Sequence, residues 1–188
     1  MPSGNLIVIS APSGSGKTTI VKETIRRNPA LGFSVSATTR KKRAGEVDGK
    51  DYFFLTPDEF KKKVDAGEFV EWEEFYGYRY GTLKAEIDRL RKNGRHLLFD
   101  VDVKGGLSIK KQYPDALLIF IRPPSIEALR ERLIGRKTED AATLQTRLDR
   151  APIELELGNK FDRQVVNDDL TRAIQEVQSI IEQHLKNK

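Results

Sequence analysis

The chain has 188 residues, no cysteine and a formal net charge of +5, from 33 basic and 28 acidic residues. This length predicts one domain with a sizeable core, and the lack of cysteine excludes a disulfide framework or a thiolate metal site. No apolar segment approaches the roughly 20 residues of a membrane span, and the N-terminus does not resemble a signal peptide. We therefore expect a cytoplasmic protein. Its excess of basic residues indicates either a nucleic-acid-binding protein or an enzyme that binds several phosphates at once.

The most informative stretch is segment 11–18, Ala-Pro-Ser-Gly-Ser-Gly-Lys-Thr, which follows the apolar run 6–9 and opens a helical pattern. A buried strand, a glycine-rich turn and a helix in this order predict a phosphate-binding loop. Backbone N–H groups of such a loop surround an anion, and the helix N-terminus adds partial positive charge. Lys17 would lie between the β- and γ-phosphates, and the Thr18 hydroxyl would reach Mg²⁺. Ala11 stands where the usual pattern has glycine, and a turn that binds nothing is the alternative.

Apolar runs alternate with helical patterns along the chain, which predicts a parallel sheet covered by helices on both faces. Thr82 and Ser125 are expected N-caps, because hydroxyl residues are typical of that position, and Thr56 to Glu59 are expected to start a helix. In chain order the expected elements are strand 6–9, helix 17–28, the short apolar run 31–35, strand 51–55, helix 56–67, the aromatic and acidic strand 68–75, a helix from Thr82 to Asn93, strand 96–102, a helix after a break at Gly105-Gly106, strand 116–121, a helix from Ser125, strand 164–167 and a C-terminal helix capped by Asp168 or Asp169.

Two further stretches have the chemistry of phosphate and metal binding. Segment 36–46 is basic and shows no strand or helix periodicity; its hydroxyl residues precede Arg40 and Arg43, which are spaced to converge on one anion. The alternative there is a solvated loop. The strand 96–102 ends in carboxylates, as does a strand that contacts magnesium at the carboxyl end of a parallel sheet. We expect Asp100 to make that contact through water.

The stretch from Arg130 to Arg150 carries five arginines around an interruption at 135–138. A helix–loop–helix that is rich in guanidinium groups and poor in core residues suits a lid that closes over phosphates. The alternative is a solvated helical hairpin with ion pairs to Glu127, Glu131 and Asp149.

Together these motifs resemble guanylate kinase over residues 4–185. The resemblance is carried by segments 10–18, 33–40, 43–46, 48–52, 68–72, 80–82 and 166–170. It implies transfer of the γ-phosphoryl group of ATP to GMP, and to dGMP as well, with Mg²⁺ as cofactor. It also implies an α/β fold: a P-loop NTPase-type parallel sheet with helices on both faces, a small mixed α/β GMP-binding subdomain and a helical lid. The expected bounds are core 1–35, 95–125 and 161–188, GMP-binding subdomain 36–94, and lid 126–160.

The resemblance also implies residue roles at matching positions. For ATP these are Ala11, Pro12, Ser13, Gly14, Ser15, Gly16, Lys17, Thr18, Thr19, the lid residues Arg132 and Arg136, and Asn167. For GMP they are Arg40, Arg43, Tyr52 and Tyr80 at the phosphate, Ser36, Glu71, Thr82 and Asp102 at the guanine, and Glu46. Catalytic roles fall on Lys17, Arg40, Arg136 and Arg147, and metal contacts on Thr18 and Asp100. Thr82 stands where many members have serine, and Lys104 where glutamine is frequent.

Glu71 has the chemistry to select guanine. A carboxylate accepts hydrogen bonds from N1–H and the 2-amino group together, whereas adenine has neither donor and would leave a buried charge unpaired. Three other functions compete with GMP phosphorylation. A guanylate-kinase-like phosphopeptide-binding module usually has a degraded phosphate loop, which this chain does not; another nucleoside-monophosphate kinase conflicts with Glu71; and nucleic-acid binding explains the arginines less well than nucleotide phosphates do. The expected partners are ATP and GMP or dGMP, without nucleic acid or membrane, and the oligomeric state stays open.

Overall fold

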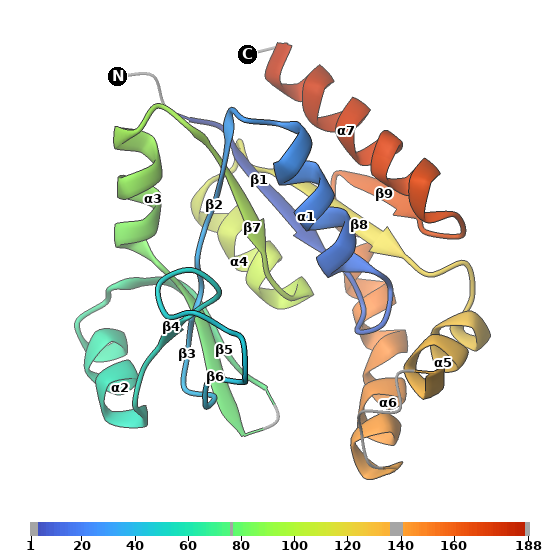
Figure 1. Ribbon diagram of the computed structural model, residues 1–188, viewed down its shortest axis with the longest axis horizontal. Coiled ribbons are helices and arrows are strands. Elements are labelled where there is room, and N and C mark those ends of the chain that lie inside the picture. Colours follow the sequence, from blue (N-terminus) through green and yellow to red (C-terminus); the bar gives the residue numbers. More distant parts are fainter. Residues whose placement is uncertain (1–3, 76, 136–140, 187–188) are drawn as a thin grey trace.

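A five-stranded parallel sheet, in the order β2-β7-β1-β8-β9, lies at the centre of the molecule (Figure 1). The computed structural model describes residues 4–75, 77–135 and 141–186. The strands are β1 (Leu6–Ser10), β2 (Leu31–Phe33), β7 (His96–Asp100), β8 (Leu117–Arg122) and β9 (Arg163–Val166). The expected parallel sheet is thus confirmed, with strand ends that differ from the expected ones by one or two residues.

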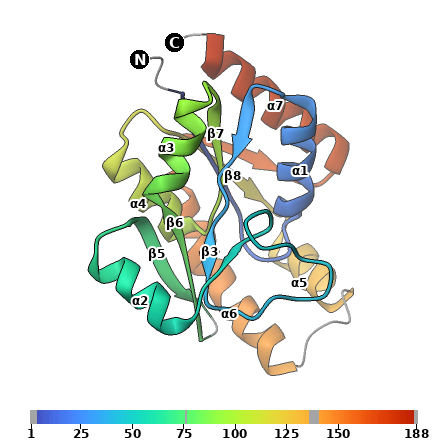
Figure 2. The same ribbon diagram turned by 60° about the vertical axis from the view of Figure 1, so that its left-hand side comes forward.

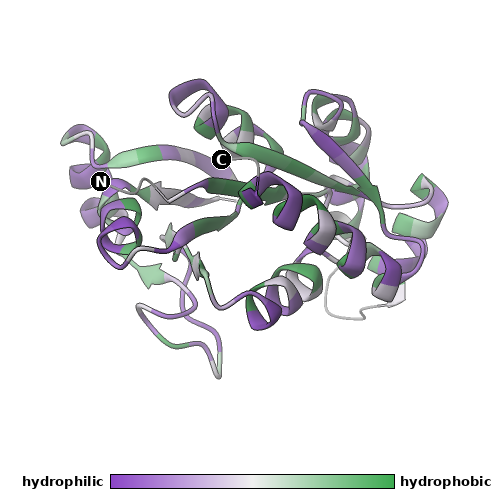
Figure 3. Cartoon of the chain, turned by 90° about the horizontal axis from the view of Figure 1, so that it is seen from above, coloured by the Kyte–Doolittle hydropathy of each residue, from purple (hydrophilic) through white to green (hydrophobic). Residues whose placement is uncertain are grey.

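Helices cover both faces of this sheet, and the side chains of β1 show why. All five residues of β1 are buried, with Ile7 and Ile9 in one apolar cluster and Leu6 and Val8 in another; this division follows from the alternation of side chains along a strand. Helices α1 (Lys17–Arg27) and α7 (Leu170–Lys186) cover the first face, and α3 (Lys84–Lys92) and α4 (Val103–Gln112) cover the second. Figure 3 shows hydrophobic strands between helices with hydrophilic outer sides.

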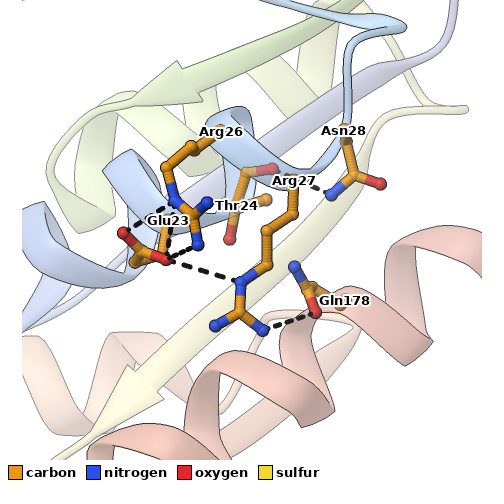
Figure 4. Close-up of polar contacts among 6 residues, drawn as sticks. All are labelled: Glu23, Thr24, Arg26, Arg27, Asn28 and Gln178. Atoms are coloured by element: carbon orange, nitrogen blue, oxygen red, sulfur yellow. Dashed lines mark hydrogen bonds and ion pairs between the residues drawn. The ribbon is translucent and has the colours of Figure 1, made fainter.

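Polar contacts hold the C-terminal end of α1 (Figure 4). Arg26 forms a forked pair with Glu23, and Asn28 donates from Nδ2 to the Thr24 carbonyl at 2.8 Å. Arg27 reaches across to Gln178 of α7 at 3.4 Å. Each exposed contact contributes little on its own. The first two contacts lie within α1 and its C-cap, and only the Arg27 contact links α1 to α7.

A second, four-stranded sheet in the order β4-β3-β6-β5 lies beyond the carboxyl end of the core sheet (Figures 1 and 2). Its strands are β3 (Ala37–Thr38), β4 (Phe53–Phe54), β5 (Phe69–Phe75) and β6 (Tyr78–Leu83), and helix α2 (Pro57–Asp65) packs on it. Phe60, Phe69 and Leu83 are buried at this contact. Thr56 and Glu59 form a capping box, which confirms the helix start expected at Thr56.

Three expectations for this part of the chain were wrong. Segment 36–46 contains the strand β3, which has only two residues and therefore no detectable period, and the expected strand 51–55 shortens to Phe53–Phe54. Thr82 is not an N-cap: it lies within β6 opposite Glu71, its hydroxyl donates to that carboxylate, and Leu83 precedes α3 without a side-chain cap.

The expected strand 96–102 also ends early, at Asp100, because the Asp102 side chain caps α4 by accepting from the Gly105 N–H at 2.7 Å. Gly105 and Gly106 lie inside α4 and are not a break before it. A Cβ atom on Gly105 would lie 2.8 Å from Glu71 Oε2, and one on Gly106 would lie 2.8 Å from the Phe161 ring. Close packing and not a turn therefore explains this glycine pair.

Two helices, α5 (Ile126–Gly135) and α6 (Ala141–Gly158), form an arm on the side opposite the small sheet (Figure 1). Leu129 and Leu133 of α5 pack on Ala151 of α6, and Ser125 accepts from the Ala128 N–H at 3.0 Å, as expected of an N-cap. Asp169 accepts from the Arg172 N–H at the start of α7. Among the described residues, no helix is both long and apolar enough to cross a bilayer.

Candidate active site

A cleft of about 850 Å³ runs between the phosphate-binding loop, the small sheet and α6. It brings together most of the residues expected to bind substrates: Ala11, Pro12, Ser13, Gly14, Gly16, Lys17, Thr18, Ser36, Arg40, Arg43, Tyr52, Glu71, Tyr80, Asp100, Asp102 and Arg147. Ser15, Thr19, Glu46, Thr82, Arg132 and Asn167 are not among the residues that line it. Arg136 lies outside the described residues.

The phosphate-binding loop connects β1 to α1 and depends on two glycines with left-handed backbones. Gly14 and Gly16 have φ angles of 92° and 88°, which side chains with a Cβ rarely adopt. Gly16 directly precedes α1 as its N-cap residue, so the free N–H groups of the helix face the loop. Ala11 is buried in the core cluster on the α1 side, where its methyl group has a packing role.

Asn167 and Arg132 support the loop from behind. The Asn167 amide donates to the Ser15 carbonyl at 2.7 Å, and Arg132 donates to the Asn167 carbonyl at 2.8 Å. A Cβ atom on Gly16 would lie 2.4 Å from Asn167 Nδ2, so the amide packs directly against the glycine backbone. These two residues therefore brace the loop in this structure, and their expected contacts with ATP stay predictions.

Lys17 is held at the end of β7. Its ammonium group lies 2.5 Å from Asp100 Oδ1 and donates to the Val101 carbonyl at 2.9 Å. The register of β1 and β7 pairs Ile9 with Asp100, so the carboxylate and the loop share one edge of the sheet. Parallel strands present their ligand-binding residues at this edge.

Arg40 is oriented by Glu46 and by two aromatic rings. Its guanidinium forms a forked pair with Glu46, at 2.7 Å and 3.0 Å, and lies 5.3 Å and 5.7 Å from the ring centres of Tyr52 and Phe54. Glu46 also accepts from the Arg43 N–H at 2.7 Å. The segment 40–46 is thus folded around the Glu46 carboxylate. This carboxylate fixes the orientation of the Arg40 guanidinium, whose planar fork of N–H donors also suits phosphate.

Two tyrosines lie next to this arginine. The Tyr52 and Tyr80 rings meet edge to face with centres 6.1 Å apart. Burial raises the pKa of the Tyr52 hydroxyl to about 12, and the Asp100 charge adds to the effect. Tyr52 therefore keeps its proton at neutral pH and can donate it in a hydrogen bond to an anion.

Glu71 is a partly buried carboxylate at the junction of the small sheet and the core. Its Oε1 accepts from the Thr82 hydroxyl at 2.6 Å, and its Oε2 faces Gly105 at the start of α4. Burial, with a smaller contribution from the charges of Asp102 and Glu73, raises the pKa of Glu71 to about 7, against the hydrogen bond from Thr82, which lowers it. A carboxylate in such a setting is typical of a functional site, because a merely structural residue would avoid the cost of burial.

Helix α6 reaches the other side of the loop. Arg147 donates from Nη1 to Ser13 Oγ at 2.7 Å. One turn further along, Arg150 pairs with Glu154 at 3.5 Å, and both residues line the cleft. The arginine-rich helix is therefore docked on the loop, which favours the phosphate-facing arm over the solvated hairpin.

Sequence reasoning did not assign to the site six residues that line the cleft, namely Glu73, Tyr78, Gly81, Val101, Arg150 and Glu154. Glu73 follows Glu71 by two positions on the same strand, a spacing that predicts a shared face. Arg150 and Glu154 follow Arg147 by three and seven positions, which places all three on one face of a helix. These spacings could have found Glu73, Arg150 and Glu154, once Glu71 and Arg147 were taken as site residues.

A phosphate-binding loop at the carboxyl edge of a parallel sheet, with guanidinium groups on both sides of one cleft, defines a P-loop nucleotide kinase. The sequence profile of the family described as guanylate kinase matches residues 3–184. The chain is 51% identical over 181 residues to a guanylate kinase of Chlorobium chlorochromatii, covering 96% of this chain and 95% of that protein. It is 47% identical over 189 residues to one of Salinibacter ruber, covering 100% of both.

A solved structure shows the same likeness. The crystal structure of guanylate kinase from Anaplasma phagocytophilum matches this one with a TM-score of 0.78 at 29% identity, covering 96% of this chain and 85% of that chain. The chain belongs to the guanylate kinase family.

Proposed function

We propose that this cleft is the active site in which the chain phosphorylates GMP to GDP with ATP, the activity of its family, and that dGMP is a second substrate. The observation that supports this site most directly is that Glu71, held by the Thr82 hydroxyl behind it, borders the same cleft as the phosphate-binding loop. A donor-phosphate site and a guanine-selecting carboxylate in one cleft are what the reaction needs.

On the donor side, the N–H groups of loop 11–18 and of the start of α1 receive the ATP phosphates, with Thr19, Arg132 and Asn167 at the edge of the site. Lys17 would exchange Asp100 for phosphate oxygens, and Arg147 would exchange the Ser13 hydroxyl for the γ-phosphate. Arg136 would act from the lid. These exchanges bring cations to the oxygens on which charge develops during transfer.

Mg²⁺ is the cofactor of this proposal. The Thr18 side chain is exposed at the cleft and the Asp100 carboxylate lines it, while no group of three or more metal-binding side chains occurs among the described residues. Two such oxygens suit an ion that keeps several waters and takes its other ligands from phosphates. Thr18 would bind directly and Asp100 through water. The ion would neutralise charge on the β- and γ-phosphates.

On the acceptor side, Arg40, Arg43, Tyr52 and Tyr80 hold the phosphate of GMP, and Glu46 keeps Arg40 in its forked orientation. A phosphate monoester oxygen is already nucleophilic near neutral pH, so the reaction needs alignment more than a general base. An oxygen of GMP attacks the γ-phosphorus in line, the bond to the β–γ bridging oxygen breaks, and that oxygen leaves with ADP.

The guanine lies against Glu71, with Ser36 and Asp102 beside it. Ionised Glu71 accepts from N1–H and from the 2-amino group. Because the Thr82 hydroxyl donates to Glu71 in this structure, Thr82 acts by fixing the carboxylate, and the Ser36 hydroxyl is the one available to the guanine carbonyl.

A coupled assay of ADP production with GMP, dGMP, AMP, CMP, UMP and dTMP tests this function. We expect turnover with GMP and dGMP, and activity at least about 10³-fold lower with AMP, because adenine leaves the Glu71 charge unpaired. Equal turnover with AMP would contradict the proposal. We also propose a cytoplasmic location, where ATP and GMP are available and where a chain without cysteine needs no oxidising folding environment; nucleic acid and membrane are not expected partners.

A further inference from the structure

Glu86 of α3 is a buried carboxylate that the proposed reaction does not use, and it is not among the residues that line the cleft. The residue is 4% exposed. Its two oxygens accept from Arg89 on the same helix, from Nε at 2.8 Å and from Nη2 at 2.9 Å. Two residues on a helix surface can form such a pair in water, so the pair does not explain why this carboxylate is buried.

A third hydrogen bond of Glu86 reaches a distant part of the chain. Its Oε2 accepts from the backbone N–H of Val35 at 3.2 Å. Val35 lies where the chain passes from the core sheet to the small sheet. The preceding residue donates from its N–H to the Leu98 carbonyl of β7 at 3.0 Å, and the following residue accepts at its carbonyl from the Phe53 N–H of β4 at 2.9 Å. Glu86 therefore holds this connection at the residue between the two sheets.

Glu86 also lies directly after a second connection between the two sheets. Strand β6 of the small sheet ends at Leu83, and α3 begins at the next residue. Ile87 and Leu90 of α3 are buried in the apolar cluster on the second face of the core sheet, so this helix is part of the core. One carboxylate on the helix thus joins the connection at 34–36 to the connection at 83–86.

The two connections carry groups that we assign to GMP. Ser36 directly follows Val35, and Thr82, whose hydroxyl holds Glu71, directly precedes the end of β6. The phosphate-binding loop lies in the core, between β1 and α1. The placement of the small sheet against the core therefore sets where GMP lies relative to ATP, and a misplacement of about 1 Å can cost on the order of 10²-fold in rate.

We propose that Glu86 is a positioning residue for phosphoryl transfer, which joins the two connections and so fixes the small sheet, with its GMP-binding groups, against the core. This inference rests on the proposed function. The bond to the Val35 N–H carries the effect, because it is the contact that reaches from α3 to the other connection. Arg89 compensates the buried charge, and its side chain, which is 50% exposed, can turn toward water.

Substitutions separate the acceptor of Glu86 from its charge. Glutamine keeps an oxygen that can accept from the Val35 N–H, whereas alanine leaves this buried N–H unpaired. We expect kcat/KM for GMP to fall about 10-fold or more in Glu86→Ala and to stay within about 3-fold of the wild type in Glu86→Gln. The KM for ATP should stay within about 2-fold in both variants, because the ATP phosphates bind to a loop of the core.

Steady-state kinetics with GMP and ATP varied in turn, and a thermal melt of each variant, measure these effects. Asp88→Ala, which truncates an exposed carboxylate on the same helix, is the matched control and should behave as the wild type. Wild-type GMP kinetics in Glu86→Ala would overturn the proposal, and so would an equal loss in Glu86→Gln or an equal rise in both KM values. If Glu86→Ala does not fold, Glu86→Asp, which retracts the carboxylate by one methylene, should show the same selective fall, and wild-type kinetics there would overturn it.

A distance measurement tests the placement of the small sheet without turnover. The chain has no cysteine, so Lys61→Cys on α2 and Gln175→Cys on α7, both at exposed positions, can carry one pair of spin labels. The distance distribution between the labels should be unchanged in Glu86→Gln and should shift or broaden in Glu86→Ala. An unchanged distribution in Glu86→Ala would overturn the proposal. A wild-type protein that forms no ADP in response to GMP would instead refute the proposed function, and the distance result would be unaffected.

Discussion

Replacement of Glu71 by glutamine tests the guanine site most directly, because it removes a charge while keeping the shape of the side chain. The amide oxygen can still accept from the Thr82 hydroxyl, which lies 2.6 Å from the carboxylate. The amide can accept only one of the two guanine donors and carries no charge. We therefore expect kcat/KM for GMP to fall about 10²-fold or more in Glu71→Gln, with little change in the KM for ATP.

The same substitution has a predictable effect on stability. Burial raises the pKa of Glu71 from 4.5 to about 7, so between these values the folded protein binds a proton that the unfolded chain has lost. Stability of the wild type should therefore fall as pH rises from about 4.5 to 7, by about 3 kcal/mol from this residue, and then level off. Glutamine does not ionise, so the free energy of unfolding of Glu71→Gln should not fall in this way. It should exceed that of the wild type at pH 8 and approach it near pH 4.5.

Urea unfolding at several pH values and GMP titrations at saturating ATP measure both effects. Glu74→Gln is the matched control, since Glu74 lies on the same strand with a side chain that is 60% exposed. Because guanine binds the ionised carboxylate, the KM for GMP should also rise about tenfold per pH unit below 7 in the wild type. The phosphate of GMP also titrates at about pH 6, and the pH dependence of KM in Glu71→Gln measures that contribution alone. A folded Glu71→Gln enzyme with unchanged GMP kinetics would refute the guanine assignment.

Three further substitutions probe the rest of the cleft. Lys17→Ala should remove most turnover and leave GMP affinity nearly intact, as measured by steady-state kinetics and GMP binding, because Lys17 faces the donor phosphates; near-wild-type turnover would count against the loop assignment. Arg147→Ala should lower kcat on the order of 10²-fold, with a smaller effect on the KM for GMP. An unchanged kcat would support the alternative interpretation of this stretch as a solvated hairpin. Gly105→Ala places a methyl group 2.8 Å from Glu71 Oε2, so the KM for GMP should rise while the KM for ATP does not, and equal effects on both would show a general distortion instead.

The core sheet and the phosphate-binding loop were predictable because their signals are local. Strand β1 is apolar from Leu6 to Ile9, and the loop combines glycines, a lysine and a hydroxyl residue at fixed spacing. The helix start at Thr56 and the cap at Ser125 were found for the same reason, since a cap acts within four residues.

Features that depend on distant contacts escaped sequence reasoning. The two residues of β3 form a strand only because β4 and β6 pair with them. Thr82 has the chemistry of an N-cap, but its hydroxyl donates a hydrogen bond to Glu71 on the neighbouring strand. Gly105 resembles a helix break, yet the glycine is there because a carboxylate packs against it. In each case a tertiary partner outweighs the local preference, and no pattern within the segment reports that partner.

Three cations of the cleft already have partners within the protein, and this limits what can replace those partners. Three pairs show the arrangement, namely Lys17 with Asp100, Arg40 with Glu46, and Arg147 with Ser13. A substrate that takes up such a cation gains only the difference between the new contact and the old one, so the net gain is smaller than the attraction between isolated charges. The gain is largest for a ligand that offers several oxygens in the geometry of the guanidinium fork, as phosphate does. The internal pairs thus favour phosphates over single anions, and they keep the arginines oriented before the nucleotides bind.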